Sequence, residues 1–381
     1  MAHALRLARR GLYTTAPNPR VGCIVAQGAD VVGAGFHQRA GEPHAEVFAL
    51  REAGTGARGA TVYVTLEPCA HYGRTPPCAE ALIAAGVARV VVAVEDPFAQ
   101  VAGRGLSMLR DAGITVETGL LGDAARELNL GFFSRIERGR PWLRVKLAMS
   151  LDGRIALASG ESKWITSAAA RADVQRWRAR SSAILTGSGT VLADDPRLTV
   201  RLPAGEAFTP PLRVVLDGQL RTPAASHVLD GSAPTLVLHA DTAQRVPPPA
   251  SCPDANAVGA QSAARSRPCA AEYRAVSGCD GMLDLRAVLG LLAARGCSEV
   301  QVEAGPTLCG ALLDAGLVDE VLLYVAPVLL GDGARPLLRL PTLTDMAARW
   351  SLDVLDQRAV GADWRLRLRP AGPAAGEGLK A

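Results

Sequence analysis

One histidine and two cysteines in the first hundred residues have the donor atoms to hold a catalytic metal ion. His44 opens the segment HAE, Cys69 closes the segment EPC, and eight residues separate Cys69 from Cys78. A catalytic zinc ion takes three protein ligands and keeps a fourth position for water, and one imidazole with two thiolates suits it. We expect both cysteines near the N-terminal ends of helices, where the dipole favours the metal-binding thiolate.

An acidic residue accompanies this predicted ligand set. Glu46 lies two residues after His44, close enough to reach a water molecule on the metal without being a ligand itself. A carboxylate there can take a proton from the water and hand it to a leaving amine. H-x-E followed by P-C and a second cysteine is typical of zinc-dependent base deaminases, although their two cysteines usually enclose two residues. We therefore predict that Glu46 is catalytic.

Two other interpretations of the cysteines stay open. His71 would complete a structural zinc site with four ligands, which leaves the acidic residue beside His44 unexplained. The second interpretation is a disulfide between Cys69 and Cys78. The N-terminus lacks the apolar core of a secretory signal, and no apolar run reaches the roughly 18 residues of a membrane span. We therefore expect a cytoplasmic protein with reduced thiols and no membrane partner, which weakens the disulfide interpretation.

Composition indicates ordinary globular domains, and the length of the chain predicts two of them. The chain has 381 residues, of which 49% are hydrophobic and 20% charged, and its net charge is +4. Without clustered basic runs, this charge does not call for a nucleic-acid partner, and we expect a small-molecule substrate instead. Pro141 marks a natural boundary. We predict a first domain over 1–140 that holds the zinc site, a second domain over 141–370 and a flexible tail over 371–381.

Helices and strands alternate in both halves, which predicts an α/β fold with largely parallel sheets. In the first half we expect strands within 21–36, 60–68, 89–97 and 115–120, and helices within 44–54, 78–88 and 105–114. In the second half we expect strands within 142–156, 183–187, 211–218, 233–240, 299–303, 320–331 and 364–370, and helices within 167–181, 285–296 and 306–316. The segment 241–281 is rich in Pro, Ala and Ser, and we expect a long loop there.

Two strand-to-turn transitions of the second half could bind phosphate. Gly187, Ser188, Gly189 and Thr190 follow one predicted strand, and Gly305 begins the turn after another. Glycine lets backbone amides approach a phosphate closely, and a helix N-terminus adds a favourable dipole. Neither segment matches G-x-G-x-x-G, so a Rossmann dinucleotide fold is not indicated. The pattern alone leaves phosphate binding and plain tight turns both open.

The quoted motifs resemble one known enzyme family over nearly the whole chain. PNPRVG, GFHQRAGEPHAE and EPCAHYGRTPPC resemble the deaminase half of the bifunctional riboflavin-biosynthesis deaminase/reductases, and VKLAMSLDGRIA, SGESKWITS, GTVLADDPRLTVR and VEAGPTL resemble the reductase half. The family usually begins several residues further upstream, whereas this chain starts within the expected first helix. The resemblance implies a cytidine-deaminase-like three-layer sandwich followed by a dihydrofolate-reductase-like domain, and a homo-oligomer.

The resemblance also implies the reactions and cofactors. A zinc-dependent deamination of 2,5-diamino-6-ribosylamino-4(3H)-pyrimidinone 5′-phosphate would precede an NADPH-dependent reduction of the ribosyl group. The product would be 5-amino-6-ribitylamino-uracil 5′-phosphate. The residues alone do not decide between NADPH and NADH, because they show no unambiguous clamp for the 2′-phosphate.

Site residues follow from the resemblance position by position. Contacts to the cofactor are implied for Ala148, Trp164, Thr190, Asp194, Gly305, Pro306, Thr307, Leu308, Cys309, Gly310 and Ala311. Contacts to the substrate of the reductase are implied for Ser162, Arg178, Leu198, Arg201 and Glu303. Further substrate contacts are expected for Asn18, His37, Arg74 and Lys146. For these four, the alternatives are a turn-forming Asn18, a surface His37, a solvated Arg74 and a solvent-facing strand Lys146.

Two different functions compete with this interpretation. A deaminase acting on bases in RNA shares H-x-E and P-C, but it predicts C-x-x-C and a basic surface. A zinc-structured scaffold with a nucleotide-sensing C-terminal domain would not be an enzyme, and Glu46 would be dispensable in it.

Overall fold

The computed structural model describes residues 1–72, 76–98, 101–243, 271–279 and 281–371. Contacts divide the chain into two compact units. The first unit comprises Met1–Pro141 together with Ala207–Thr209 and Ala293–Ser298, and the second unit comprises the rest. Arg74, most of the expected loop over 241–281 and nearly all of the expected tail lie outside the described residues.

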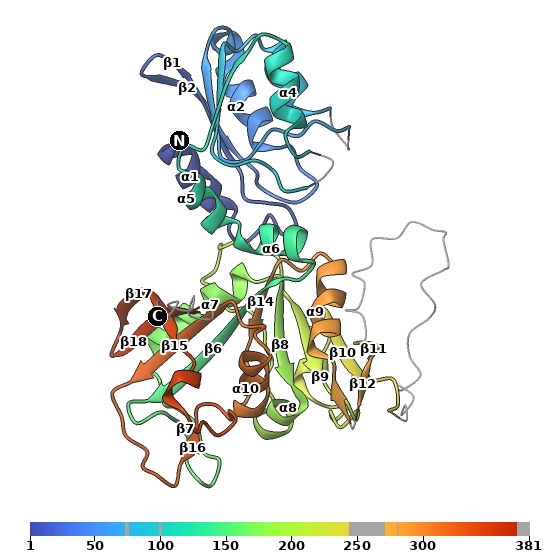
Figure 1. Cartoon of the computed structure of the whole chain (residues 1–381), viewed down its shortest axis with the longest axis vertical. Coiled ribbons are helices and arrows are strands. Elements are labelled where there is room, and N and C mark those ends of the chain that lie inside the picture. Colours follow the sequence, from blue (N-terminus) through green and yellow to red (C-terminus); the bar gives the residue numbers. More distant parts are fainter. Residues whose placement is uncertain (73–75, 99–100, 244–270, 280, 372–381) are drawn as a thin grey trace, which may run out of the picture. The chain divides into compact units, whose positions relative to one another are not determined.

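A five-stranded sheet with helices on both faces forms the first unit (Figure 1). Its strands are β1 (Gly22–Gln27), β2 (Asp30–Phe36), β3 (Thr61–Val64), β4 (Arg89–Val92) and β5 (Thr115–Thr118). Its helices are α1 (Ala2–Ala8), α2 (Ala45–Ala53), α3 (Cys78–Ala84), α4 (Arg104–Asp111), α5 (Gly122–Leu128) and α6 (Leu130–Arg138), with 3₁₀ turns at Arg9–Gly11 and Gly54–Ala57. The strand order is β2-β1-β3-β4-β5, and β3, β4 and β5 are mutually parallel.

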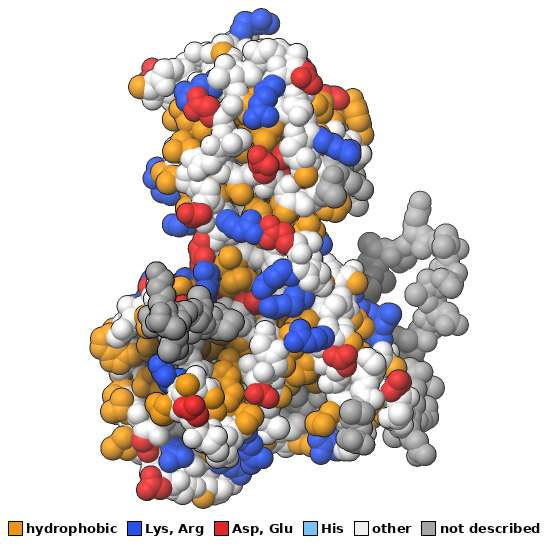
Figure 2. All heavy atoms as spheres, in the orientation of Figure 1, with side chains coloured by type: hydrophobic (Ala, Val, Ile, Leu, Met, Phe, Trp, Pro, Cys, Tyr) orange, Lys and Arg blue, Asp and Glu red, His pale blue; other side chains and the backbone are white. Residues whose placement is uncertain are grey.

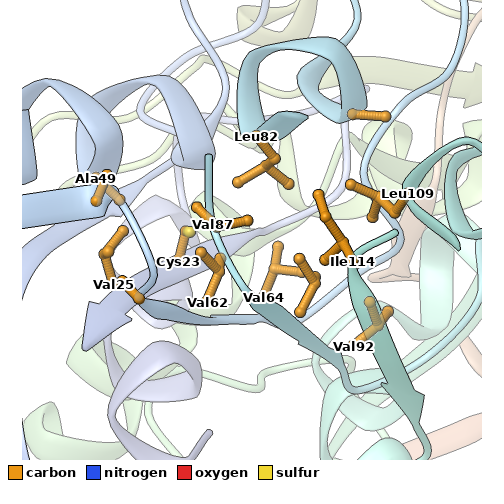
Figure 3. Close-up of a cluster of buried hydrophobic side chains, with 14 of the residues drawn as sticks. Cys23, Val25, Ala49, Val62, Val64, Leu82, Val87, Val92, Leu109 and Ile114 are labelled. Carbon is orange, nitrogen blue, oxygen red and sulfur yellow. The ribbon is translucent and has the colours of Figure 1, made fainter. Parts of the chain in front are cut away.

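Side chains alternate across this sheet and so produce the three layers that the family resemblance implies. Cys23 and Val25 of β1 face the main core with Val62 and Val64 of β3, opposite apolar side chains of α2, α3 and α4 (Figure 3). A Cβ atom on Gly22 would lie 2.0 Å from the carbonyl oxygen of Ala4 in α1, so glycine is needed where this helix packs on the other face.

A nine-stranded sheet forms the second unit. Its strands, in sheet order, are β11 (Glu272–Val276), β10 (Thr235–Ala240), β9 (Leu212–Leu216), β8 (Ala183–Gly187), β14 (Glu299–Val302), β6 (Trp142–Ser150), β15 (Glu320–Ala326), β18 (Asp363–Pro370) and β17 (Leu352–Val360). Short strand pairs outside this sheet are β7 (Arg154–Ala156) with β16 (Arg335–Pro336), and β12 (Gly278–Cys279) with β13 (Met282–Leu283). The helices are α7 (Ala168–Arg180), α8 (Ser188–Asp194), α9 (Leu285–Ala294) and α10 (Pro306–Asp314), with 3₁₀ turns at His227–Leu229 and Met346–Ala348.

The parallel strands of this sheet deliver their carboxyl ends to one edge. β8 and β14 are parallel neighbours, and each leads directly into a helix, α8 and α10 respectively. Ligands of open α/β sheets bind in the crevice outside such strand ends. The sheet therefore prepares a binding site where α8 and α10 begin.

The expected elements are present, and the structure adds helices α5 and α6, which the sequence analysis did not predict. Two further differences are informative. The sequence predicts a glycine turn after β8, but helix α8 starts at once at Ser188. Strand β17 is absent from the prediction because it is an edge strand with most of its residues exposed, and so it lacks the apolar run of a buried strand.

Candidate zinc centre and reductase cavity

The structure brings His44, Cys69 and Cys78 together in the first unit. His44 is the N-terminal flanking residue of α2, Cys78 is the first residue of α3, and Cys69 lies in the loop after β3. The Nδ1 atom of His44 lies 3.5 Å from Sγ of Cys69 and 3.3 Å from Sγ of Cys78. All three donor atoms lie within 4.8 Å of one another, and this is the metal-ligand group found among the described residues.

These distances fit a zinc ion. Bonds of about 2.0–2.1 Å to nitrogen and about 2.3 Å to sulfur at a tetrahedral angle separate the two ligand atoms by roughly 3.6 Å. Both nitrogen–sulfur distances are close to that value. His71 is exposed and lies outside the group, so the described residues offer three ligands rather than four. Cys69 and Cys78 are free thiols rather than a disulfide.

The two thiols are arranged to share negative charge. Hydrogen bonding from Cys78, together with His44, lowers the pKa of the Cys69 thiol to about 4. The backbone N–H of Cys78 also donates to Sγ of Cys69 at 3.3 Å, as expected at the start of a helix. Cys69 in turn raises the pKa of the Cys78 thiol, because a thiolate at Cys69 disfavours a second negative charge beside it. A cation between the two sulfurs would remove that opposition.

Glu46 lies beside the triad with one carboxylate oxygen free. Its side chain is 3% exposed, and Oε2 has no hydrogen-bond partner among the described residues. Burial raises the pKa of Glu46 to about 7, against the opposite effect of His44. A buried carboxylate oxygen without a partner is costly, so it needs a group that the protein itself does not supply. This orphaned atom is a second sign that the site holds a ligand.

Asn18 and His37 form a hydrogen-bonded pair next to the triad. The His37 ring packs edge-on against the His44 ring, with their centroids 5.5 Å apart. Nδ1 of His37 lies 3.2 Å from the carbonyl oxygen of Pro43, so this nitrogen carries the proton, and Nε2 accepts from the Asn18 amide at 3.1 Å. The pair fixes the Asn18 amide, whose oxygen has no hydrogen-bond partner within the described parts of the chain. His37 is 2% exposed, which excludes the surface interpretation.

Glu67 anchors the loop that carries Cys69. Its buried carboxylate accepts four backbone N–H groups. The donors are Asp96, Gly103, Gly105 and Leu106, at 3.2, 3.0, 3.0 and 3.3 Å. A Cβ atom on Gly105 would lie 2.0 Å from the carbonyl oxygen of Pro68, so α4 begins directly against the segment that leads to Cys69. The sequence analysis missed Glu67, whose partners all lie at least 29 residues away.

The second unit contains a cavity of about 980 Å³ at the carboxyl ends of its parallel strands. Of the residues expected at the cofactor, Ala148, Thr190, Asp194, Gly305, Pro306, Thr307, Leu308 and Ala311 line it. Of those expected at the substrate, Ser162, Arg178, Leu198, Glu303 and Lys146 line it. Its volume lies at the upper end of the roughly 300–1,000 Å³ that is typical of ligand sites.

Arg178 and Glu303 form the main ion pair of the cavity wall. Nε and Nη2 of Arg178 donate to the two carboxylate oxygens of Glu303 at 2.6 and 2.7 Å. Burial alone would raise the pKa of Glu303, but Arg178 lowers it to about 2. Lys146 lies near this pair, and burial lowers its pKa. Lys146 is therefore a cavity residue rather than a solvent-facing strand residue.

The α8 and α10 starts offer space for a phosphate-bearing cofactor. The Gly305 N–H donates to the Thr190 hydroxyl at 3.1 Å, which joins the two helix starts. A Cβ atom on Gly189 would meet nothing within 4 Å, and one on Gly305 would meet only the Thr190 hydroxyl at 3.9 Å. Glycine at these positions is therefore not needed by the fold itself. It leaves a cradle open for close approach of a ligand, which fits NADPH.

Four residues expected in the reductase site do not line the cavity. They are Trp164, Arg201, Cys309 and Gly310. Trp164 is 70% exposed, with the Arg171 guanidinium over its ring. Partial burial, and then the nearby Arg178 guanidinium, lower the pKa of Arg201. The Cys309 thiol donates to the Ala304 carbonyl, and Gly310 packs against the Arg339 backbone.

Other cavity residues were missed by the sequence analysis. Gly218, Gln219 and Arg221 follow β9, while Met282 and Leu283 belong to β13. The segment LRVVLDGQLR contained the necessary signal, because polar residues just after a parallel strand lie at the ligand-binding edge. Met282 and Leu283 carry no such signal, because they form a strand of only two residues, which is too short for a periodic pattern.

Comparison with known proteins agrees with this geometry. Residues 1–94 match the cytidine and deoxycytidylate deaminase zinc-binding region, and residues 141–364 match the RibD C-terminal domain. The chain is 48% identical to riboflavin biosynthesis protein RibD of Escherichia coli, over 97% of this chain and 98% of the relative. It is 45% identical to the protein of that name from Haemophilus influenzae, over 98% of this chain and 97% of the relative.

Solved structures agree over the whole chain as well. Acinetobacter baumannii RibD, form 1, is similar with a TM-score of 0.85 and 44% identity, over 97% of this chain and 98% of that one. A diaminohydroxyphosphoribosylaminopyrimidine deaminase/5-amino-6-(5-phosphoribosylamino)uracil reductase from Thermotoga maritima has a TM-score of 0.82 and 32% identity, over 97% of both chains.

Fold and site together define a bifunctional enzyme: a zinc-binding, cytidine-deaminase-like domain followed in the chain by a RibD C-terminal reductase domain. Zinc fits the first domain and NADPH the second. The chain belongs to the RibD family of riboflavin biosynthesis proteins.

Proposed function

We propose that the first unit hydrolytically deaminates 2,5-diamino-6-ribosylamino-4(3H)-pyrimidinone 5′-phosphate. The second unit then reduces the ribosyl group of the product to a ribityl chain with NADPH. The observation that carries the proposal is the buried, unpartnered Glu46 carboxylate oxygen beside the His44, Cys69 and Cys78 donor atoms. The name of the Thermotoga maritima relative supports this order, because its deaminase is named for a diaminopyrimidine and its reductase for an aminouracil, the deaminated form.

In the deaminase site, each residue has a role that follows from its contacts. A bound zinc ion would lower the pKa of a water molecule and so supply a nucleophile at neutral pH. Oε2 of Glu46 accepts the proton of this water and donates it to the amine that leaves, so that water and amine become carbonyl and ammonia. The Asn18 amide, held by His37, supplies a donor or acceptor for the edge of the pyrimidine.

In the reductase site, we assign substrate and cofactor to different parts of one cavity. NADPH would supply a hydride to the ribosyl group. The starts of α8 and α10 hold the cofactor through Gly189, Thr190 and Gly305. Lys146 and the Arg178–Glu303 pair hold the sugar phosphate, because together they present cations and a carboxylate to hydroxyl and phosphate oxygens.

We also propose domain limits of 1–140 and 141–370, a small-molecule substrate without a nucleic-acid partner, a homo-oligomer and a cytoplasmic location. On the face in Figure 2, basic and acidic side chains are interspersed, which supports the absence of a nucleic-acid surface there. Free thiols at Cys69 and Cys78 suit a reducing compartment. Within the described residues, no helix is long and apolar enough to span a membrane.

Substitution of Glu46 tests the deaminase assignment. Glu46→Gln should keep its zinc but release ammonia about 10²- to 10⁴-fold more slowly, because an amide cannot carry the proton. NADPH oxidation with substrate that is already deaminated should continue at the wild-type rate. Glu52→Gln, an exposed change on the same helix, is the matched control. A normal rate of ammonia release from Glu46→Gln would exclude Glu46 as the proton carrier.

A further inference from the structure

Arg221 places an uncompensated positive charge on the wall of the reductase cavity. It follows β9 and lines the cavity together with Ser188 and Gln219. Its Nη2 atom donates to the Ser188 hydroxyl at 3.3 Å. No ion pair within the described part of the chain involves Arg221, and its side chain is exposed to the cavity mouth. A guanidinium and a hydroxyl side by side suit a phosphate group.

The carboxylate of Asp217 fixes the backbone at Arg221, and both of its oxygens already accept hydrogen bonds. Asp217 is fully buried at the end of β9. Its two carboxylate oxygens accept the backbone N–H groups of Arg221 and Thr222 at 2.9 and 2.6 Å. In Rossmann folds that bind NADH, which this domain is not, a carboxylate binds the ribose 2′-hydroxyl. Asp217 cannot serve in this way, because it is turned inward and occupied.

Arg221 lies on the cofactor side of the cavity. Ser188, its hydrogen-bond partner, is the first residue of α8, and Thr190 of that helix accepts the Gly305 N–H at the start of α10. Arg178 and Lys146, which are half-buried cations of the cavity, gather around Glu303 instead, and the exposed Arg335 lines the cavity elsewhere. Arg221 is therefore set apart from the residues assigned to the substrate.

We propose that the Arg221 guanidinium and the Ser188 hydroxyl bind the 2′-phosphate of NADPH and thereby select NADPH over NADH. The inference rests on the proposed cofactor site at α8 and α10. NADH has a hydroxyl group in place of this phosphate, so it gains nothing from a cation at that point. The pyrophosphate, which both cofactors share, is the competing partner for Arg221.

Binding measurements separate these two partners without relying on turnover. The full chain is titrated by calorimetry with NADPH, NADH, adenosine 2′,5′-bisphosphate and adenosine 5′-monophosphate. Arg221→Ala should weaken NADPH and the bisphosphate about 10- to 100-fold, because a charge-assisted hydrogen-bonded contact is lost. NADH and the monophosphate should bind as they do to the wild type. Arg221→Lys should recover part of the affinity for NADPH, since it restores the charge.

Arg197→Ala is the matched control, because Arg197 is an exposed arginine of the same unit that pairs with Asp230 and does not line the cavity. It should leave all four affinities unchanged. Equal weakening of NADPH and NADH by Arg221→Ala would assign Arg221 to the pyrophosphate and overturn the inference, and so would unchanged NADPH affinity. Failure of the wild-type protein to bind either dinucleotide would instead overturn the cofactor site itself, and this assignment with it.

Discussion

Replacing Glu67 with glutamine should destabilise the deaminase unit severely while changing only one atom. The Glu67 carboxylate is 4% exposed and accepts four backbone N–H groups, two on each oxygen. The amide nitrogen of glutamine cannot accept, so two of these buried donors lose their partner. Each unsatisfied buried donor costs about 1–3 kcal/mol, which gives a loss of about 2–6 kcal/mol in the free energy of unfolding. A typical domain has about 5–15 kcal/mol in total.

Zinc release during urea unfolding reports on this unit alone, because the ligand triad lies within it. The urea midpoint for release should fall sharply in Glu67→Gln, whereas reductase activity with deaminated substrate should persist at low urea. Glu117→Gln is the matched control: its exposed carboxylate pairs with Arg89 on β4, and the midpoint should not change measurably. An unchanged midpoint in Glu67→Gln would refute the view that this carboxylate holds α4 and the Cys69 loop in place.

Further outcomes concern the metal, the substrate and pH. Metal analysis should find one zinc ion per chain, and a strong chelator should abolish ammonia release but leave NADPH oxidation intact; loss of both activities would contradict separate sites. Arg201→Ala should raise the substrate KM far more than the NADPH KM, since Arg201 lies near the Arg178–Glu303 pair, and burial together with Arg178 lowers its pKa. Burial opposes ionisation of Glu320, but Arg144 and Arg367 lower its pKa to about 2. Stability from this group is therefore present above pH 4.5 and is lost as pH falls toward 2, and Glu320→Gln should flatten that acid loss in thermal melts.

Much of the fold and of the zinc centre could be predicted from sequence because their signals are local. Gly28 between two apolar runs marks the β1–β2 turn, and its φ of 58° is one that glycine adopts freely. Gly54 ends α2 in the same way, with a φ of 52°. His44 and Glu46 share one helix start, and the rigid EPC and PPC segments restrict where the thiols can lie.

The remaining features depend on contacts between segments that are distant in sequence. The four donors to Glu67 come from the loop and helix that follow β4. The residues next to Glu67 in the sequence therefore do not indicate them. Arg221 reaches the cavity because β9 and β8 are parallel neighbours, which brings its turn beside Ser188. Strand β17 pairs only with β18 at the sheet edge and carries no buried apolar run. Such features require the strand order, which the pattern of residues does not specify.

The most direct test of two chemistries in one chain is a stepwise assay of the purified protein with the diaminopyrimidine ribosyl phosphate. Without NADPH, the wild-type protein should release one equivalent of ammonia and then stop. Addition of NADPH should cause the loss of one equivalent of its absorbance and yield the ribityl product. In Glu46→Gln, neither signal should appear at the wild-type rate until deaminated substrate is added, which should restore NADPH oxidation alone. NADPH oxidation that precedes ammonia release, or ammonia release that Glu46→Gln leaves untouched, would contradict both the order of the reactions and the site assigned to the first.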